Sequence, residues 1–285
     1  MTTILLALST SFLFGCSDFS GGIASRRDSS VLVTVTSHIV GVSLLLLVMI
    51  ALPAAAPGSS DLFWGGVAGL SGGIGVACLY AGLSRGRMSI VAPVTAALSA
   101  AIPAAFDLVT GSSVGPVAIG GMVLAIVAVI IVTVSTDEAI EEHSVGASYN
   151  PTKALMFAIL GGIGFAGSFL AFSMTSVDSG MWPVVAARAV SITLMGTASI
   201  VTLRRVRLKR AAVSPALIAG VLDTVANITM LTAIRIGPLA LAAVLGSLYP
   251  VVVVLLASVF LGERLARTQR VGVAIALVAV ILTAI

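Results

Sequence analysis

Long apolar segments separated by short polar breaks run along the whole chain. A helix needs about 20 predominantly apolar residues to cross the hydrocarbon core of a bilayer. Ten segments meet this requirement: 3–25, 31–52, 62–84, 88–108, 116–135, 152–176, 181–203, 213–234, 239–261 and 268–285. The pattern therefore predicts an all-α integral membrane protein with ten transmembrane helices.

The composition excludes a water-soluble domain. Charged residues make up 9% of the chain and hydrophobic residues 59%, with a mean hydropathy of +1.18, whereas soluble domains carry about 25% charged residues. The net charge of +4 lies in short basic runs with few aromatics for base stacking, so we expect no nucleic-acid partner. Cys16 and Cys78 are isolated in apolar segments, so we expect no metal site, no disulfide and no cofactor.

The chain divides into two halves around a hydrophilic segment. Residues 136–151 contain four of the 11 acidic residues, whereas the other connections are short. A shift of 151 residues aligns the helix ends of the two halves and places Gly121 on Gly272. We therefore predict a five-helix repeat at 1–135, a linker at 136–151 and a second repeat at 152–285. Because five is odd, the second repeat must have inverted topology, which is typical of secondary transporters.

The basic residues fall on one side of the predicted membrane. Thirteen of the 15 Lys and Arg residues lie in loops or helix ends after predicted helices 1, 3, 5, 7 and 9, while Arg188 lies inside the membrane and Arg235 on the opposite side. Cytoplasmic loops carry an excess of Lys and Arg. The pattern thus predicts a multi-pass protein of the cytoplasmic (inner) membrane, with those five loops in the cytoplasm and both termini outside.

Three polar residues fall near the middle of predicted helices 7 and 8. Arg188 and Asp223 lie at similar depth, and Asn227 lies one turn after Asp223 on the same helical face. Ionisable residues within a membrane are costly and usually face a cavity or a partner. Two interpretations follow: the three residues bind a charged or zwitterionic solute, or Arg188 and Asp223 form a structural pair that joins two helices.

Several motifs resemble those of the EamA family of the drug/metabolite transporter (DMT) superfamily. Ser247-Leu248-Tyr249-Pro250 and, further on, Leu261-Gly262-Glu263-Arg264 are similar to the S-L-Y-P and L-G-E-R motifs of that family, at matching spacing. Ala187-Arg188 resembles the A-R pair of its second helix. The first half departs from the pattern, because Ser99 stands where Pro250 does in the second half. The resemblance implies a transporter and not an enzyme.

Four further residues are candidates for the transport site. Asp18 lies where small multidrug-resistance relatives carry a coupling carboxylate, although it could instead pair with the bases at the end of its helix. His38 could relay protons or hydrogen-bond a backbone carbonyl. Tyr80 and Tyr249 lie deep enough in their helices to line a cavity for an organic solute. We therefore list Asp18 and His38 for proton coupling, and the two tyrosines for binding.

These observations predict a secondary active transporter that exports a small organic metabolite, such as an amino acid or a related compound. The sequence has no P-loop motif, which disfavours ATP drive and favours proton coupling or exchange. Two alternatives are a flippase of a lipid-linked carrier and a membrane-embedded enzyme that modifies lipids, and the second lacks the clustered His, Asp or Glu residues that it would need. We expect a monomer or a homodimer.

Overall fold

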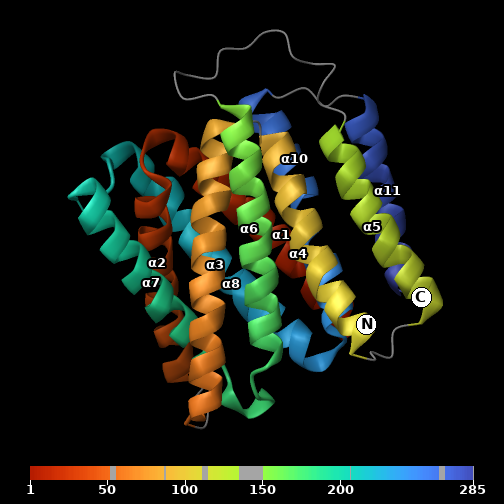
Figure 1. The fold of residues 1–285 in the computed structure, drawn as a ribbon, viewed down its shortest axis with the longest axis horizontal. Coiled ribbons are helices and arrows are strands. Elements are labelled where there is room, and N and C mark those ends of the chain that lie inside the picture. Colours follow the sequence, from red (N-terminus) through yellow and green to blue (C-terminus); the bar gives the residue numbers. More distant parts are fainter. Residues whose placement is uncertain are drawn as a thin grey trace.

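The computed structural model describes residues 1–51, 56–86, 88–110, 115–134, 150–205, 207–262 and 267–284, and its regular structure there is entirely helical (Figure 1). The helices are α1 (Thr2–Arg27), α2 (Ser30–Ala51), α3 (Ser59–Arg85), α4 (Met88–Val109), α5 (Pro116–Val134), α6 (Pro151–Ser173), the short 3₁₀ helix η2 (Val177–Ser179), α7 (Trp182–Leu203), α8 (Arg210–Ile236), α9 (Leu239–Gly246), α10 (Tyr249–Leu261) and α11 (Arg267–Ala284). The predicted linker lies, except for Asn150 and Pro151, outside the described residues.

Seven spans among the described residues are long and apolar enough to cross a membrane. They are α1, α2, α3, α6, α7 and α8, together with Leu239–Leu261, which contains α9 and α10. This confirms a multi-pass, all-α membrane protein. Helices α4, α5 and α11 lie over the other three predicted segments, so the count of ten transmembrane helices stays a prediction.

The span predicted as one helix at 239–261 consists of two. Helix α9 ends at Gly246, and α10 begins at Tyr249 with Pro250 in its first turn. Proline has no N–H to donate to the preceding turn, and its ring clashes with the carbonyl four residues earlier. The Ser247 hydroxyl bonds the carbonyl of Val244 at 2.8 Å. The helix within this apolar segment is therefore interrupted just before Pro250.

The two halves of the chain interleave. The closest helix pairs join one half to the other: α3 packs on α6, α1 on α8 and α5 on α11, while α2 lies against α7 and α8. Small residues allow these approaches, as is common between membrane helices. A Cβ atom added to Gly164 of α6 would lie 2.7 Å from the Cα atom of Gly75 in α3, closer than real contacts allow.

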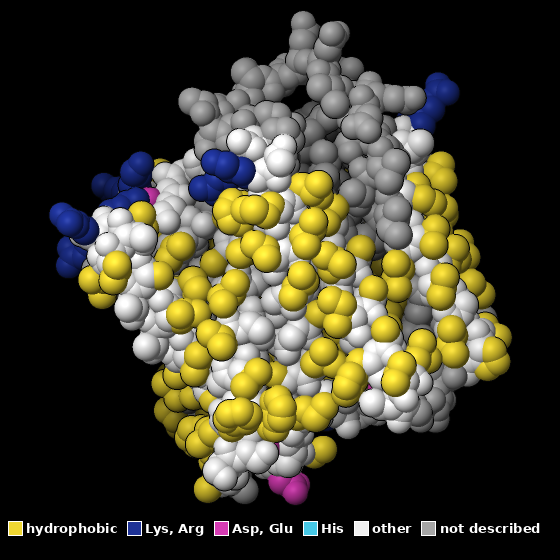
Figure 2. Space-filling view, in the orientation of Figure 1, with side chains coloured by type: hydrophobic (Ala, Val, Ile, Leu, Met, Phe, Trp, Pro, Cys, Tyr) yellow, Lys and Arg dark blue, Asp and Glu magenta, His cyan; other side chains and the backbone are white. Residues whose placement is uncertain are grey.

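The outer surface of the bundle is apolar between two different ends. Large hydrophobic side chains face outward, among them Phe12, Leu47, Phe63 and Val201, each at least 60% exposed. The N- and C-termini lie at one end of the bundle (Figure 1), and the Lys and Arg side chains gather at the other (Figure 2). An apolar belt with a basic end suits a protein that is solvated by lipid around its sides.

Candidate functional site: a buried polar cluster inside the bundle

Arg188, Asp223 and Asn227 meet inside the bundle, as the sequence predicted. Arg188 Nη2 of α7 forms an ion pair with Asp223 Oδ2 of α8, and the two side chains are only 6% and 7% exposed. Asn227 Nδ2, one turn later on α8, donates to Asp223 Oδ1 at 3.2 Å and to the Asp223 carbonyl at 2.8 Å. Both carboxylate oxygens of Asp223 thus have a partner. This satisfies the requirement that a buried charge be paired and hydrogen-bonded.

His38 of α2 extends this polar cluster. It is 2% exposed, and its Nδ1 lies 2.7 Å from Oγ of Ser191. Ser191 follows Arg188 by three residues on α7, so the two side chains share a face of the helix. Sequence reasoning missed Ser191. The three-residue spacing from Arg188 was the signal that could have indicated it.

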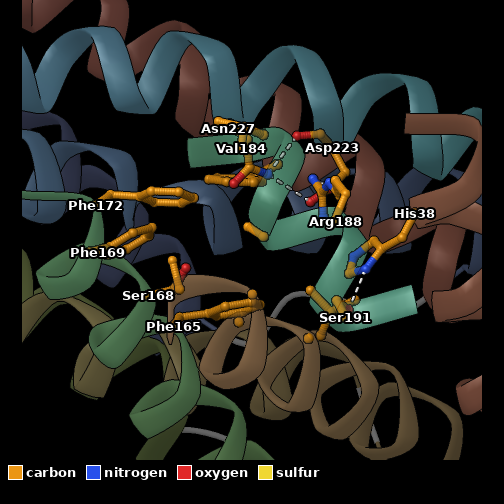
Figure 3. A pocket seen from close by; sticks show the side chains of 17 residues that line it. His38, Phe165, Ser168, Phe169, Phe172, Val184, Arg188, Ser191, Asp223 and Asn227 are labelled. Carbon is orange, nitrogen blue, oxygen red and sulfur yellow. Dashed lines mark hydrogen bonds and ion pairs between the residues drawn. The ribbon is translucent and has the colours of Figure 1, made fainter. Parts of the chain in front are cut away.

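The cluster forms one wall of a small pocket (Figure 3). The opposite wall consists of Phe165, Phe169 and Phe172, which lie on one face of α6 because they are four and then three residues apart. The open space between the walls is about 30 Å³, on a scale where one water molecule needs about 10–15 Å³. The pocket is therefore small: its volume admits water but no organic solute. Sequence reasoning had not singled out these three phenylalanines for the site.

The close approach of α3 to α7 completes the pocket. Gly69 and Gly73 of α3 line it, and a Cβ atom on Gly69 would lie 2.1 Å from the carbonyl oxygen of Ala187, next to Arg188. A Cβ atom on Gly73 would lie 2.2 Å from Ser191 Oγ. Only glycine therefore fits against the backbone of α7 here, and these contacts set the position of Arg188 relative to the pocket.

Asp18, Tyr80 and Tyr249 do not line this pocket. Asp18 of α1 is 5% exposed, and its carboxyl accepts no hydrogen bond from the described residues. It lies within electrostatic range of Asp223 and of both tyrosines. The Tyr80 ring lies against Gly21 of α1, and the Tyr249 hydroxyl donates to the carbonyl of Ala92 at 3.4 Å. These three residues thus form a second polar region beside the pocket.

The basic end of the bundle has a polar contact that we call the Asp28 latch, which consists of Asp28, Arg205 and Lys209. The Asp28 carboxylate, just after α1, accepts bonds from the Arg205 side chain at 3.0 Å and from the backbone N–H of Lys209 at 2.7 Å. Burial acts to raise the pKa of Asp28, but these bonds and one from the Ser29 N–H outweigh it and lower the pKa to about 2. The hydrogen bond to Asp28 and the charge of its carboxylate in turn raise the pKa of Arg205. The latch thus joins the α1–α2 connection to the α7–α8 connection.

The opposite end of the bundle has a comparable contact, the Asp61 latch, which consists of Asp61, Ser176, Ser179 and Arg235. Asp61 at the start of α3 accepts a bond from the backbone N–H of Ser176 at 2.7 Å and one from its hydroxyl at 3.1 Å. Arg235 at the end of α8 donates to Ser179 Oγ at 2.7 Å. The α6–α7 connection is therefore bonded to both α3 and α8 at this end.

The stability that Asp28 contributes is expected to be independent of pH near neutrality. Its pKa is lowered from about 3.8 to about 2 in the folded protein, so its contribution is complete above pH 4 and is lost as the pH falls toward 2. Asp28→Asn should lower the melting temperature by roughly 2–4 °C for each kcal/mol of unfolding free energy lost. The decrease should be the same at every pH from 5 to 8. Thermal unfolding in detergent across pH 2–8 measures this.

The matched control is Asp178→Asn in η2, because Asp178 is exposed and its replacement should leave the melting temperature unchanged. If the melting temperature of wild type exceeded that of Asp28→Asn by an amount that grows as the pH falls below 4, the lowered pKa assigned to Asp28 would be contradicted.

The fold and the site together define a class of protein. Buried ionisable groups beside a small pocket, within a multi-helix bundle that is apolar outside, are typical of proteins that move a solute across the membrane. Residues 152–285 match the model of the EamA-like transporter family. This is the family whose motifs the residues around Arg188 and Tyr249 resemble, and the match covers the second half of the chain.

Solved structures share the fold, among them one crystal structure. It aligns with 98% of this chain and 95% of its own, with a TM-score of 0.73 and 15% sequence identity. No curated protein matches the sequence significantly. The structural likeness extends over both halves of the chain, whereas the family match covers the second.

Proposed function

We propose that the chain is a secondary active transporter that exports a small organic metabolite, such as an amino acid or a related compound, by alternating access. The observation that carries the proposal is the buried Arg188–Asp223 pair beside a small pocket. A charged pair is expensive to keep in a membrane unless it serves a partner or a pathway. The pair lies among helices from both halves of the chain. A solute bound there would be exposed first to one side of the membrane and then to the other as the halves move.

The pairing of helices supports ten spans in two inverted repeats. If α1–α5 and α6–α11 are exchanged as units, with α9 and α10 counted as one span, the pair α1–α8 becomes α6–α3, and α2–α7 and α5–α11 map onto themselves. A two-fold relation between the halves would produce this pattern. Helices α1 and α6 also begin at opposite ends of the bundle, as inverted insertion requires (Figure 1).

The two latches support alternating access. The pocket is too small for an organic solute, so the helices around it must separate on one side to admit one. The Asp28 latch closes the basic end and the Asp61 latch the other. The 151-residue shift places Asp28 on Ser179, so the two latches lie at corresponding positions of the repeats. We infer that the latches open one at a time.

We further propose that the basic end faces the cytoplasm, with both termini outside, in the inner membrane. The gathering of Lys and Arg at that end supports this orientation (Figure 2). For the energy source, proton coupling or exchange through Asp18 or His38 stays our expectation, since both side chains are buried near the Arg188–Asp223 pair.

Transport by inside-out membrane vesicles tests the proposal. We expect vesicles containing the chain to accumulate at least one labelled solute from a panel of amino acids, nucleosides and sugars when a proton gradient or an internal exchange partner is supplied. A C-terminal epitope tag reports the orientation, because it should be accessible in intact cells and protected in these vesicles. Vesicles that match chain-free controls for the whole panel under both conditions would refute the transporter.

A further inference from the structure

Two buried N–H groups at the pocket have no hydrogen-bond partner among the described residues: Arg188 Nε and the ring nitrogen Nε2 of His38. Arg188 and His38 are 5% and 2% exposed, and both line the pocket. A buried donor without a partner destabilises a protein, and it does so most when the donor is charged. Two such donors at one small pocket therefore indicate that something else accepts their hydrogen bonds.

The hydrogen-bond network determines that both nitrogens are donors. Arginine has donors only, and Arg188 uses Nη2 for Asp223. Ser191 has no other acceptor among the described residues, so we assign its hydroxyl proton to the bond with His38 Nδ1. That bond makes Nδ1 the acceptor, and a neutral imidazole with Nδ1 as acceptor carries its proton on Nε2.

Water can accept these bonds while the pocket holds no solute, but a solute that displaces this water has to bring an acceptor of its own. Asp223 already uses one oxygen for Arg188 and the other for Asn227. A carboxylate fits the two donors, because it offers two oxygens and forms strong charge-assisted bonds with arginine. The pocket is neutral with Arg188 and Asp223 both charged, so a zwitterion would enter without adding net charge to a region of low dielectric.

The rest of the pocket is apolar. Phe165, Phe169 and Phe172 face the polar wall from α6 (Figure 3), and a substrate body held between them would be hydrophobic. On the premise of the proposed function, we propose that Arg188 Nε and His38 Nε2 bind the carboxylate of the transported solute, which is an amino acid with an apolar side chain. The His38 imidazole is thereby a specificity-determining donor, and Ser191 positions it.

A set of four probes separates the contributions. Leucine has both charged groups, leucinamide has only the ammonium, 4-methylpentanoate has only the carboxylate, and 4-methylpentanamide has neither. Binding to the purified full chain is measured by isothermal titration in detergent. Leucine should bind most tightly, and leucinamide roughly tenfold to hundredfold more weakly, because it leaves the two donors without a charged acceptor.

Variants of His38 assign the effect to the imidazole. His38→Phe should weaken leucine binding roughly tenfold to hundredfold and leave leucinamide binding within about threefold of wild type. His38→Gln, whose amide nitrogen can donate from a similar position, should recover most of the leucine affinity. Ser191→Ala should weaken leucine binding by less than His38→Phe does, and it provides the test if His38→Phe does not fold.

Three results would overturn the proposal. They are equal affinities for leucine and leucinamide, equal losses for both probes in His38→Phe or Ser191→Ala, and no leucine binding by protein that transports another solute of the panel. In the last case the proposed transport function is supported and the proposed substrate class is wrong. If the panel shows no transport at all, the proposed function itself fails.

Discussion

Replacing Arg188 by Ala is expected to abolish transport and to lower the free energy of unfolding by about 3–5 kcal/mol. The substitution leaves the Asp223 carboxylate buried with only Asn227 as a side-chain partner. Asp223→Asn should abolish transport as well, because it leaves the Arg188 guanidinium without its counter-charge. Both proteins should still insert, since neither change shortens an apolar span. Solute accumulation in vesicles and unfolding in detergent measure the two effects separately.

A double variant separates the binding role of this pair from a structural one. Arg188→Met combined with Asp223→Leu removes both charges and fills a similar volume. Replacing a buried ion pair by apolar residues is often neutral or stabilising by about 1–4 kcal/mol. We therefore expect this protein to regain wild-type stability without regaining transport. Wild-type transport by the double variant would mean that the pair only joins α7 to α8.

The second large effect is expected from a single methyl group on α3. Gly69→Ala would place a Cβ atom 2.1 Å from the carbonyl oxygen and 2.5 Å from the Cα atom of Ala187. Because both are backbone atoms, the clash is relieved only if α3 and α7 move apart. Overpacking of this kind typically destabilises by about 1–3 kcal/mol. The shift also displaces Arg188, the neighbour of Ala187, so transport should fall at least tenfold.

Gly66→Ala is the matched control, one turn earlier on the same helix. A Cβ atom at Gly66 would meet its nearest neighbour, a methyl group of Val190, at 3.5 Å, which is ordinary contact. Alanine also favours a helix over glycine by up to about 1 kcal/mol, so this variant should be as stable as wild type or more so. Equal behaviour of the two variants would show that the approach of α3 to α7 does not control the site.

Part of the candidate site could be predicted from the sequence alone. Arg188, Asp223 and Asn227 were predictable because charges and amides are rare in apolar segments, and the spacing of Asp223 and Asn227 puts them on one helical face. The bond between His38 and Ser191 was not predictable in the same way. It joins residues 153 positions apart on α2 and α7, and nothing in the local sequence indicates which helices become neighbours.

The chain by itself determined that this is a membrane protein and that its Lys and Arg residues gather at one end, because apolar length and charge distribution are properties of linear segments. Pro250 is a residue type that interrupts a helix, and the structure places the interruption just before it, between α9 and α10. Only the tertiary structure decided that Phe165, Phe169 and Phe172 face Arg188 across one pocket, and that Tyr80 and Tyr249 lie outside it. The reason is physical: an apolar residue on a membrane helix is equally well solvated by lipid or by protein, so its sequence position alone does not say which of the two it meets.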